Sequence, residues 1–205
     1  TFTATPTVGI APQCNRTGGA VRSIWIGIEG SLVSDLTKYK LYPESPNQVQ
    51  IANRLETSPD MDDDYGELLQ GYLCPPQSGD YIFWIAGDDQ NQFWLSSDRT
   101  PQNRSLTAFI PAWTEYREWN KYPEQKSATL KLLANQAYYF EVLHKESIHG
   151  DSVSVAWQGP GFEQQIIEGR YLAPYANNVP TLVPTTTPTA VPSTGSKVYL
   201  PVVIR

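Results

Sequence analysis

The 205-residue chain lacks an excess of positive charge, and its apolar runs are short. Its 15 Lys and Arg residues against 21 Asp and Glu residues give a net charge of −6. An acidic chain without a basic run is a poor candidate for binding nucleic acid or an anionic membrane surface. The longest uncharged apolar run, Val198 to Ile204, is far shorter than a membrane-spanning helix. No signal-peptide pattern follows Thr1, so we expect any signal peptide to have been removed.

Cysteine is scarce, and only Cys14 and Cys74 occur. The absence of a CxxC pair argues against a cysteine-based zinc or redox site. The two thiols are either joined in a disulfide or buried and free. We favour the disulfide because other features indicate a secreted chain. Closing a loop of this size stabilises a fold by about 4 kcal/mol.

Catalytic motifs are also missing. The chain contains no GxSxG, HExxH, GxGxxG or phosphate-binding loop. His144 and His149 are its only histidines, which leaves little basis for a histidine-activated nucleophile. Loop carboxylates could form a glycosidase pair, but adjacent carboxylates on loops suit a metal ion better. We therefore expect a protein that is not an enzyme.

Threonine and proline are concentrated near the two ends of the chain. Residues 1–17 and 177–196 are rich in both, a composition typical of semi-rigid, extended spacers. Residues 197–205 form a short apolar segment, which is a docking strand, a partner-binding tail or part of a sorting signal. The 12% aromatic content indicates a folded domain, which we place at residues 18–176. This organisation is typical of a module from a longer extracellular protein.

Within residues 18–176, apolar and polar residues alternate with the two-residue period of β-strands. Tyr81 to Ala86 is apolar on both faces, as in the central strand of a sandwich. Other strands are predicted at residues 21–28, 92–95, 129–132, 138–143 and 152–157, and a short helix at Ser34 to Tyr42. Gly and Pro separate these runs. The sequence predicts an all-β fold, a sandwich or a barrel.

One predicted hairpin has the polar tip Gly87-Asp88-Asp89 between two apolar strands. Two adjacent carboxylates repel each other, and a divalent cation with oxygen ligands would relieve the repulsion. Neighbouring side chains of an extended chain point to opposite sides. Both would face one ion only with an unusual backbone, such as a cis peptide bond. The alternative is a simple polar turn, which the residues alone favour.

Several motifs, taken in order, resemble those of the PA-fourteen (PA14) domain, a family named after a domain of the anthrax protective antigen. They are Gly79-Asp80-Tyr81, Gly87-Asp88-Asp89, Phe93-Trp94-Leu95, Tyr138 to Glu146, Gly150-Asp151 and Val153 to Pro160. The resemblance implies an antiparallel β-sandwich. Some members of the family are calcium-dependent lectins of adhesins and glycosidases, so it also implies a calcium-dependent carbohydrate-binding module.

The resemblance further implies that Asp88 and Asp89 share a cis peptide bond and hold calcium, to which sugar hydroxyls bind directly. A second loop, here Lys145 to Asp151, supplies more ligands, which in the family often include an Asn side chain. No Asn is present in this loop, so Glu146 or Asp151 would substitute as an oxygen ligand. The predicted metal ligands are Asp88, Asp89, Glu146 and Asp151, and the predicted ligand-binding residues are Asp88, Asp89, Gln90, Trp94 and His149.

Tryptophans and a second acidic run are further candidates. Trp94, Trp113 and Trp119 either stack on sugar rings or pack as loop anchors, and packing is the commoner role of Trp. Residues 60–66 contain four aspartates but do not match a helical calcium loop. We expect them to form a solvated acidic loop.

The expected partners are glycans or a cell-surface polysaccharide, bound by a monomeric module of a larger secreted or surface-attached protein. The alternative is a structural or protein-interaction module without a sugar site. In that case the Asp88–Asp89 loop holds calcium only for rigidity, or holds no ion. Analogy with the family favours the carbohydrate-binding hypothesis. The identity of the sugar depends on loop shapes, which strand patterns do not reveal.

Overall fold

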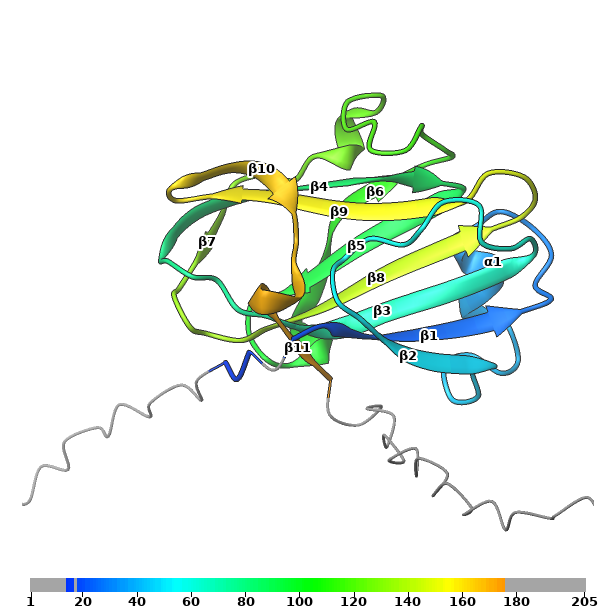
Figure 1. Cartoon of the computed structure of the whole chain (residues 1–205), viewed down its shortest axis with the longest axis horizontal. Coiled ribbons are helices and arrows are strands. Elements are labelled where there is room, and N and C mark those ends of the chain that lie inside the picture. The colour runs from blue at the N-terminus through cyan, green and yellow to red at the C-terminus, as the bar shows by residue number, and fades with distance from the viewer. Residues whose placement is uncertain (1–13, 17, 176–205) are drawn as a thin grey trace, which may run out of the picture.

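The strands of the chain pair into two sheets packed face to face (Figure 1). The computed structural model describes residues 14–16 and 18–175. Within this part, the predicted all-β antiparallel sandwich is confirmed. The spacer predicted at 177–196, the apolar segment 197–205 and most of the first spacer lie outside the described residues. No helix in the described part is both long and apolar enough to cross a membrane.

Seven strands form the larger sheet and four form the smaller one. The larger sheet contains β1 (Ala20–Ile26), β2 (Gln48–Ala52), β3 (Tyr65–Leu73), β5 (Gln90–Ser96), β6 (Arg104–Ile110), β8 (Tyr138–Glu146) and β11 (Leu172–Pro174). The smaller contains β4 (Gly79–Asp88), β7 (Leu130–Leu132), β9 (Ser152–Gly159) and β10 (Phe162–Ile166). Their orders are β2-β1-β3-β8-β5-β6, with β11 beside β3, and β10-β9-β4-β7. All these pairings are antiparallel.

The core lies between the two sheets, where alternate side chains of the strands point inward. Phe93, Phe140 and Val142 from the larger sheet meet Phe83 and Trp157 from the smaller one. All five are almost completely buried. Their burial provides the main driving force for closing the sandwich. On the outer face of β4, Trp84 is also buried, and the Lys126 ammonium lies 5.4 Å from the centroid of its ring. Apolar residues on both sides of this strand are therefore covered.

The outer face of the larger sheet is partly covered by residues 28–47, which include the helix α1 (Val33–Thr37). Val33 and Leu36 of this helix are buried in a second, smaller apolar cluster. The helix is shorter than predicted. After Thr37 the chain forms turns, in which the backbone N–H of Tyr42 donates to the carbonyl three residues earlier. The described 3-10 helices are η1 (Pro101–Asn103), η2 (Pro123–Gln125) and η3 (Gly169–Tyr171).

The chain crosses between the sheets twice at the same end of the sandwich. One crossing runs from β4 to β5 and the other from β8 to β9. Asp88 pairs with Ser152, and Gln90 pairs with Lys145, so the two crossings lie side by side. The topology therefore brings together two loops that lie about sixty residues apart in the sequence.

The opposite end of β3 is closed by the predicted disulfide between Cys14 and Cys74, which the structure contains. The backbone N–H of Cys14 also donates to the carbonyl of Asn135 at 2.9 Å. Nearby, Leu172 of β11 pairs with Leu73. Both ends of the described chain thus lie beside one end of β3 (Figure 1).

Candidate functional site

The two neighbouring crossings gather three carboxylates, which we call the carboxylate cluster: Asp88, Asp89 and Glu146. One oxygen from each residue lies within 4.8 Å of the oxygens of the other two. Asp88 is the last residue of β4, and Glu146 is the last residue of β8. The peptide bond between Asp88 and Asp89 is cis. The structure brings the predicted pair Asp88 and Asp89 together with Glu146. Glu146 is one of the two residues predicted to replace the Asn ligand.

Close backbone packing holds the Asp88–Asp89 segment in place. A Cβ atom at Gly87 would lie 2.1 Å from the carbonyl oxygen of Ser152 and 2.5 Å from Asn91 Nδ2. Only glycine allows this approach without displacing its neighbours. On its other side, Gly87 N–H donates to Thr114 Oγ1 at 2.8 Å, and Thr114 N–H donates to the Gly87 carbonyl at 2.7 Å. Thr114 is thereby fixed beside Gly87, the residue before the cluster.

A buried histidine supports the cluster from the side of the core. His144 Nδ1 lies 2.8 Å from Glu67 Oε1, and His144 Nε2 lies 2.7 Å from the carbonyl oxygen of Asp88. Both partners accept hydrogen bonds, so the ring donates from both nitrogens as an imidazolium. Burial alone would lower the pKa of His144, but the hydrogen bond and charge of Glu67 raise it above its ordinary value. Glu67 also pairs with Arg22, and all three side chains are buried.

The carboxylates of the cluster have few partners of their own. Glu146 is fully buried, and neither of its carboxylate oxygens has a hydrogen-bond partner among the described residues. Asp89 Oδ2 accepts a hydrogen bond from Ser147 N–H at 3.0 Å. Burial, reinforced by the charge of Asp89, raises the pKa of Asp88 to about 6 and that of Glu146 to about 8. In residues 14–16 and 18–175 no ion pair neutralises the three groups.

This donor set fits calcium. A buried carboxylate with unpartnered oxygens is costly unless a cation or proton compensates its charge. Calcium takes six to eight oxygen ligands, and carboxylates are prominent among them. Asp88, Asp89 and Glu146 would hold such an ion.

Asp151 has a different environment from these three residues. Its Oδ2 accepts hydrogen bonds from Met61 N–H at 2.7 Å and Asp62 N–H at 3.0 Å, and it is not part of the carboxylate cluster. The acidic run at residues 60–64 is therefore held against the second loop. Asp64 N–H also donates to the Ser147 carbonyl at 2.6 Å. The side chains of residues 60–63 are exposed, as a solvated loop requires.

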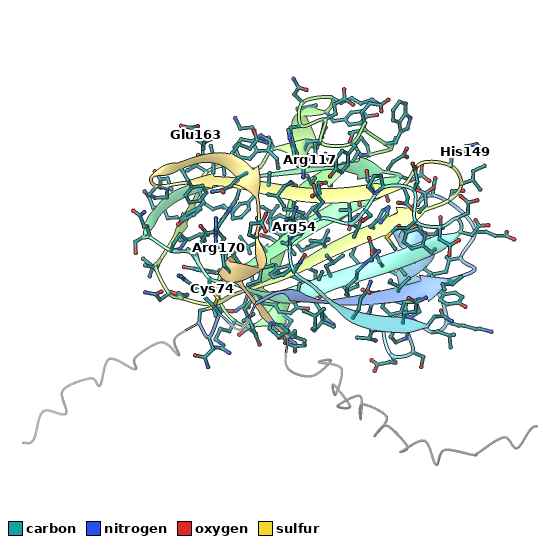
Figure 2. All side chains as sticks on the ribbon, viewed as in Figure 1. Arg54, Cys74, Arg117, His149, Glu163 and Arg170 are labelled. Carbon is teal, nitrogen blue, oxygen red and sulfur yellow. A yellow bond between two sulfur atoms is a disulfide. The ribbon has the colours of Figure 1, made fainter. Side chains whose placement is uncertain are left out.

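The other predicted ligand-binding residues lie in three different settings. His149 is exposed in the β8–β9 loop at one end of the sandwich (Figure 2), and its backbone N–H donates to Asp63 Oδ1 at 3.0 Å. The Gln90 side chain bridges backbone groups, accepting from Val33 N–H at 2.8 Å and donating to the Pro111 carbonyl at 3.3 Å. Trp94 pairs with Glu141 within the larger sheet and packs against its outer apolar cluster. His149 thus lies in the loop that follows Glu146, whereas Trp94 lies on the outer face of the larger sheet.

An exposed tryptophan beside the cluster is the functional candidate that the sequence marked only weakly. Trp113 is 45% exposed and precedes Thr114, which bonds to Gly87. The Lys121 ammonium lies 3.0 Å from the centroid of the Trp113 ring. The sequence placed Trp113 in a polar stretch, but the contact between that stretch and Gly87 had no sequence signal.

Comparison with known proteins assigns the family. The sequence profile of the PA14 domain matches residues 45–168. The chain belongs to the PA14 domain family. A PA14 sugar-binding domain from an RTX adhesin has a TM-score of 0.59 at 12% identity, and the match covers 77% of this chain and 99% of that one. The epithelial adhesin 6 A domain of Candida glabrata, in complex with Galβ1-3GlcNAc, has a TM-score of 0.56 at 12% identity, covering 80% of this chain and 90% of that one.

Curated relatives of this PA14 domain are much longer proteins. The mouse N-acetyl-beta-glucosaminyl-glycoprotein 4-beta-N-acetylgalactosaminyltransferase 1 is 34% identical over 155 residues, which are 72% of this chain and 15% of that protein. Fibrocystin of Canis lupus familiaris is 27% identical over 84 residues, which are 37% of this chain and 2% of that protein. The chain therefore spans a small part of either relative.

Proposed function

We propose that this PA14 domain is a calcium-dependent, non-catalytic carbohydrate-binding module, a monomeric part of a larger secreted or surface-attached protein. The observation that carries the proposal is the carboxylate cluster, in which Glu146 has two buried, unpartnered oxygens. The fold shared with adhesin sugar-binding domains supports the sugar as ligand. The disulfide supports an oxidising, extracellular environment.

Each part of the site has a role in this proposal. Asp88, Asp89 and Glu146 hold the cation, and His144 fixes the backbone of Asp88 through its carbonyl. A bound calcium ion supplies open coordination positions for two vicinal hydroxyls of a sugar. The exposed ring of Trp113 offers an apolar face on which a sugar can pack. A single sugar buries little area, so multivalent display would provide the strength of attachment.

The names of two similar proteins suggest the first sugars to test. The mouse relative is named for an N-acetyl-beta-glucosaminyl-glycoprotein, and the adhesin domain was solved with Galβ1-3GlcNAc. N-acetylglucosamine is common to both. We therefore propose glycans that contain N-acetylglucosamine as the leading ligand class.

A glycan array probed with the full 205-residue chain tests this function, once in calcium and once in EDTA. We expect binding in calcium that is lost in EDTA. Asp88→Asn should abolish calcium binding and this glycan binding. Asp80→Asn is the matched control, because Asp80 lies at the other end of β4 in an exposed pair with Lys131.

Two outcomes would contradict the proposal. If every glycan that binds in calcium binds unchanged in EDTA and to the Asp88→Asn protein, carbohydrate recognition lies outside the carboxylate cluster. An absence of glycan binding in both buffers would favour a structural or protein-interaction module.

A further inference from the structure

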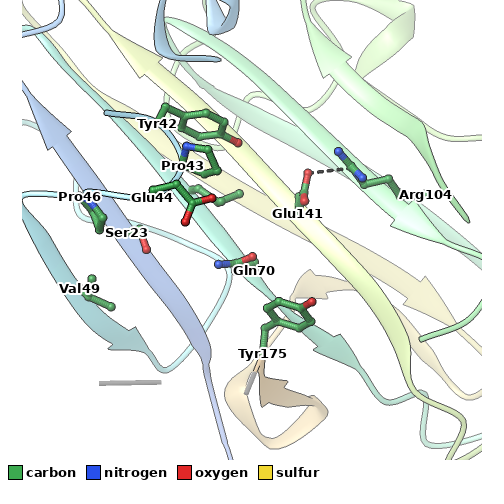
Figure 3. A pocket seen from close by; sticks show the side chains of 11 residues that line it. Ser23, Tyr42, Pro43, Glu44, Pro46, Val49, Gln70, Arg104, Glu141 and Tyr175 are labelled. Atoms are coloured by element: carbon green, nitrogen blue, oxygen red, sulfur yellow. Dashed lines mark ion pairs between the residues drawn. The ribbon is translucent and has the colours of Figure 1, made fainter. Parts of the chain in front are cut away.

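A cavity of about 590 Å³ lies over the outer face of the larger sheet (Figure 3). In this view Tyr42 and Tyr175 lie at opposite ends of the cavity, with Gln70 between them. Its volume is in the range of small-molecule binding sites. Glu141 lines it and lies five residues before Glu146 on β8, about 17 Å along the strand. Their side chains point to opposite faces of the sheet, so the cavity and the carboxylate cluster are separate sites.

The floor of the cavity contains buried polar groups with unused hydrogen-bonding capacity. Ser23 is 3% exposed and Gln70 is 5% exposed, and both line the cavity. One end of the Gln70 amide lies 3.1 Å from the Tyr139 hydroxyl, which leaves its other end without a partner among the described residues. The Ser23 hydroxyl has no partner in that part of the chain either. Polar groups in such a floor favour a ligand that hydrogen-bonds to them.

The charges around the floor compensate one another. Arg104 Nε lies 2.9 Å from Glu141 Oε2, and the Tyr139 hydroxyl donates to Glu141 Oε1 at 2.7 Å. Burial, together with the charge of Glu141, raises the pKa of Tyr42 to about 12. The Tyr42 hydroxyl therefore remains a neutral donor at physiological pH.

These features select one class of ligand. An anion would meet an arginine that is already paired, and it would also meet Glu44 in the lining. A purely apolar ligand would bury Ser23 and Gln70 without hydrogen bonds, which is costly. A neutral sugar has hydroxyls that both donate and accept, and C–H faces that pack on aromatic rings.

We propose that this cavity is a second, calcium-independent carbohydrate site that takes a neutral saccharide. The Tyr42 and Tyr175 rings pack against the apolar faces of the sugar, and Ser23 and Gln70 bind its hydroxyls. This site does not depend on the carboxylate cluster.

The test uses the full-length Asp88→Asn protein in EDTA, which removes the proposed calcium site. It is probed with an array of neutral and sulfated oligosaccharides, followed by calorimetric titration of the strongest neutral binder. We expect a neutral oligosaccharide to bind, and Tyr175→Ala to weaken its binding about tenfold. Tyr116→Ala is the matched control, because Tyr116 is a 45% exposed tyrosine outside the cavity. It should leave binding unchanged.

Tyr42→Phe provides a second variant in case Tyr175→Ala disturbs folding, since it removes only a hydroxyl. It should weaken saccharide binding without changing the melting temperature. The proposal is overturned if no neutral oligosaccharide binds in EDTA, if sulfated ones are preferred, or if Tyr42→Phe binds like its parent. Loss of all glycan binding in EDTA would overturn this site and leave the calcium-dependent function intact. If instead all glycan binding persists in EDTA and is weakened by the Tyr42 and Tyr175 variants, this site is supported and the calcium-dependent function is overturned.

Discussion

Protonation of the carboxylate cluster controls what it can bind. The folded-state pKa values of Asp88 and Glu146, about 6 and about 8, lie above the ordinary values of 3.8 and 4.5. Without calcium, each carboxyl group therefore holds its proton more strongly in the folded protein than in the unfolded chain, at pH values between its ordinary and its folded-state pKa. The contribution of these groups to stability falls as the pH rises through that window.

Calcium binding should show the opposite pH dependence, because the ion requires ionised carboxylates. We expect the calcium-induced rise in melting temperature to be larger at pH 8.5 than at pH 5.5. Thermal unfolding with and without calcium at the two pH values measures this difference. In the Glu146→Gln protein, the calcium-induced rise in melting temperature should change little between pH 7 and pH 8.5. Equal calcium effects at both pH values in the unmodified chain would contradict the assignment.

Gly87 is the residue whose replacement should damage the site most directly through the backbone. A Cβ atom there would overlap the Ser152 carbonyl at 2.1 Å. We expect Gly87→Ala to lower the free energy of unfolding by about 1–3 kcal/mol, measured by urea denaturation. Gly150→Ala is the control, since its Cβ would meet nothing closer than 3.5 Å. Equal stabilities for the two variants would show that the strand pairing at Gly87 is looser than described.

Among the individual residues of the site, the sequence predicts the Asp88–Asp89 pair but neither the choice of Glu146 nor the supporting histidine. Asp88 and Asp89 are neighbours in the chain, so their motif is visible directly. The choice between Glu146 and Asp151 depends on which side chain points inward at the end of β8, and loop sequence does not specify that. The Glu67–His144 pair joins residues 77 positions apart, so only the folded sheet brings it together.

Among the elements, strands with clear alternation were predictable and the central strand of the larger sheet was not. The runs 138–143 and 152–157 lie within β8 and β9 as predicted. In contrast, β3 was not predicted. It pairs with β1 and β8, its Leu68 lies under the outer cover, and its Glu67 is buried in an ion pair. A strand covered on both faces that also buries a charge shows no two-residue pattern.

The segment at residues 111–126 makes a distinct prediction about sugar binding. Trp113→Ala should weaken calcium-dependent glycan binding about tenfold and leave calcium affinity and stability nearly unchanged, because the ring is exposed. Tyr116→Ala, in the same segment and equally exposed, is the control. Glycan and calcium titrations on both variants separate the two effects. Unchanged glycan binding in Trp113→Ala would remove this ring from the site.

For the whole molecule, the disulfide is the main covalent restraint that the structure contains. Cys14 and Cys74 are 60 residues apart, and loop-closure entropy assigns about 4 kcal/mol to a cross-link of that span. We expect reduction to lower the free energy of unfolding by about that amount in a urea titration. The double variant Cys14→Ala/Cys74→Ala should unfold like the reduced protein and should not respond to reductant. A stability that is unchanged by reduction would contradict this role.

The position of the two chain ends has a mechanical consequence. Both ends of the described chain lie beside Leu73, through the Cys14–Cys74 bond and the pairing of Leu172. Tyr65 lies at the far end of β3, about 27 Å from Leu73 along the strand. There it pairs with Glu146 of the carboxylate cluster. A pulling force transmitted through both ends therefore loads the disulfide and β11, and the carboxylate loops lie off its path. A domain held in this way keeps its carboxylate-bearing loops unstrained when its two ends are pulled.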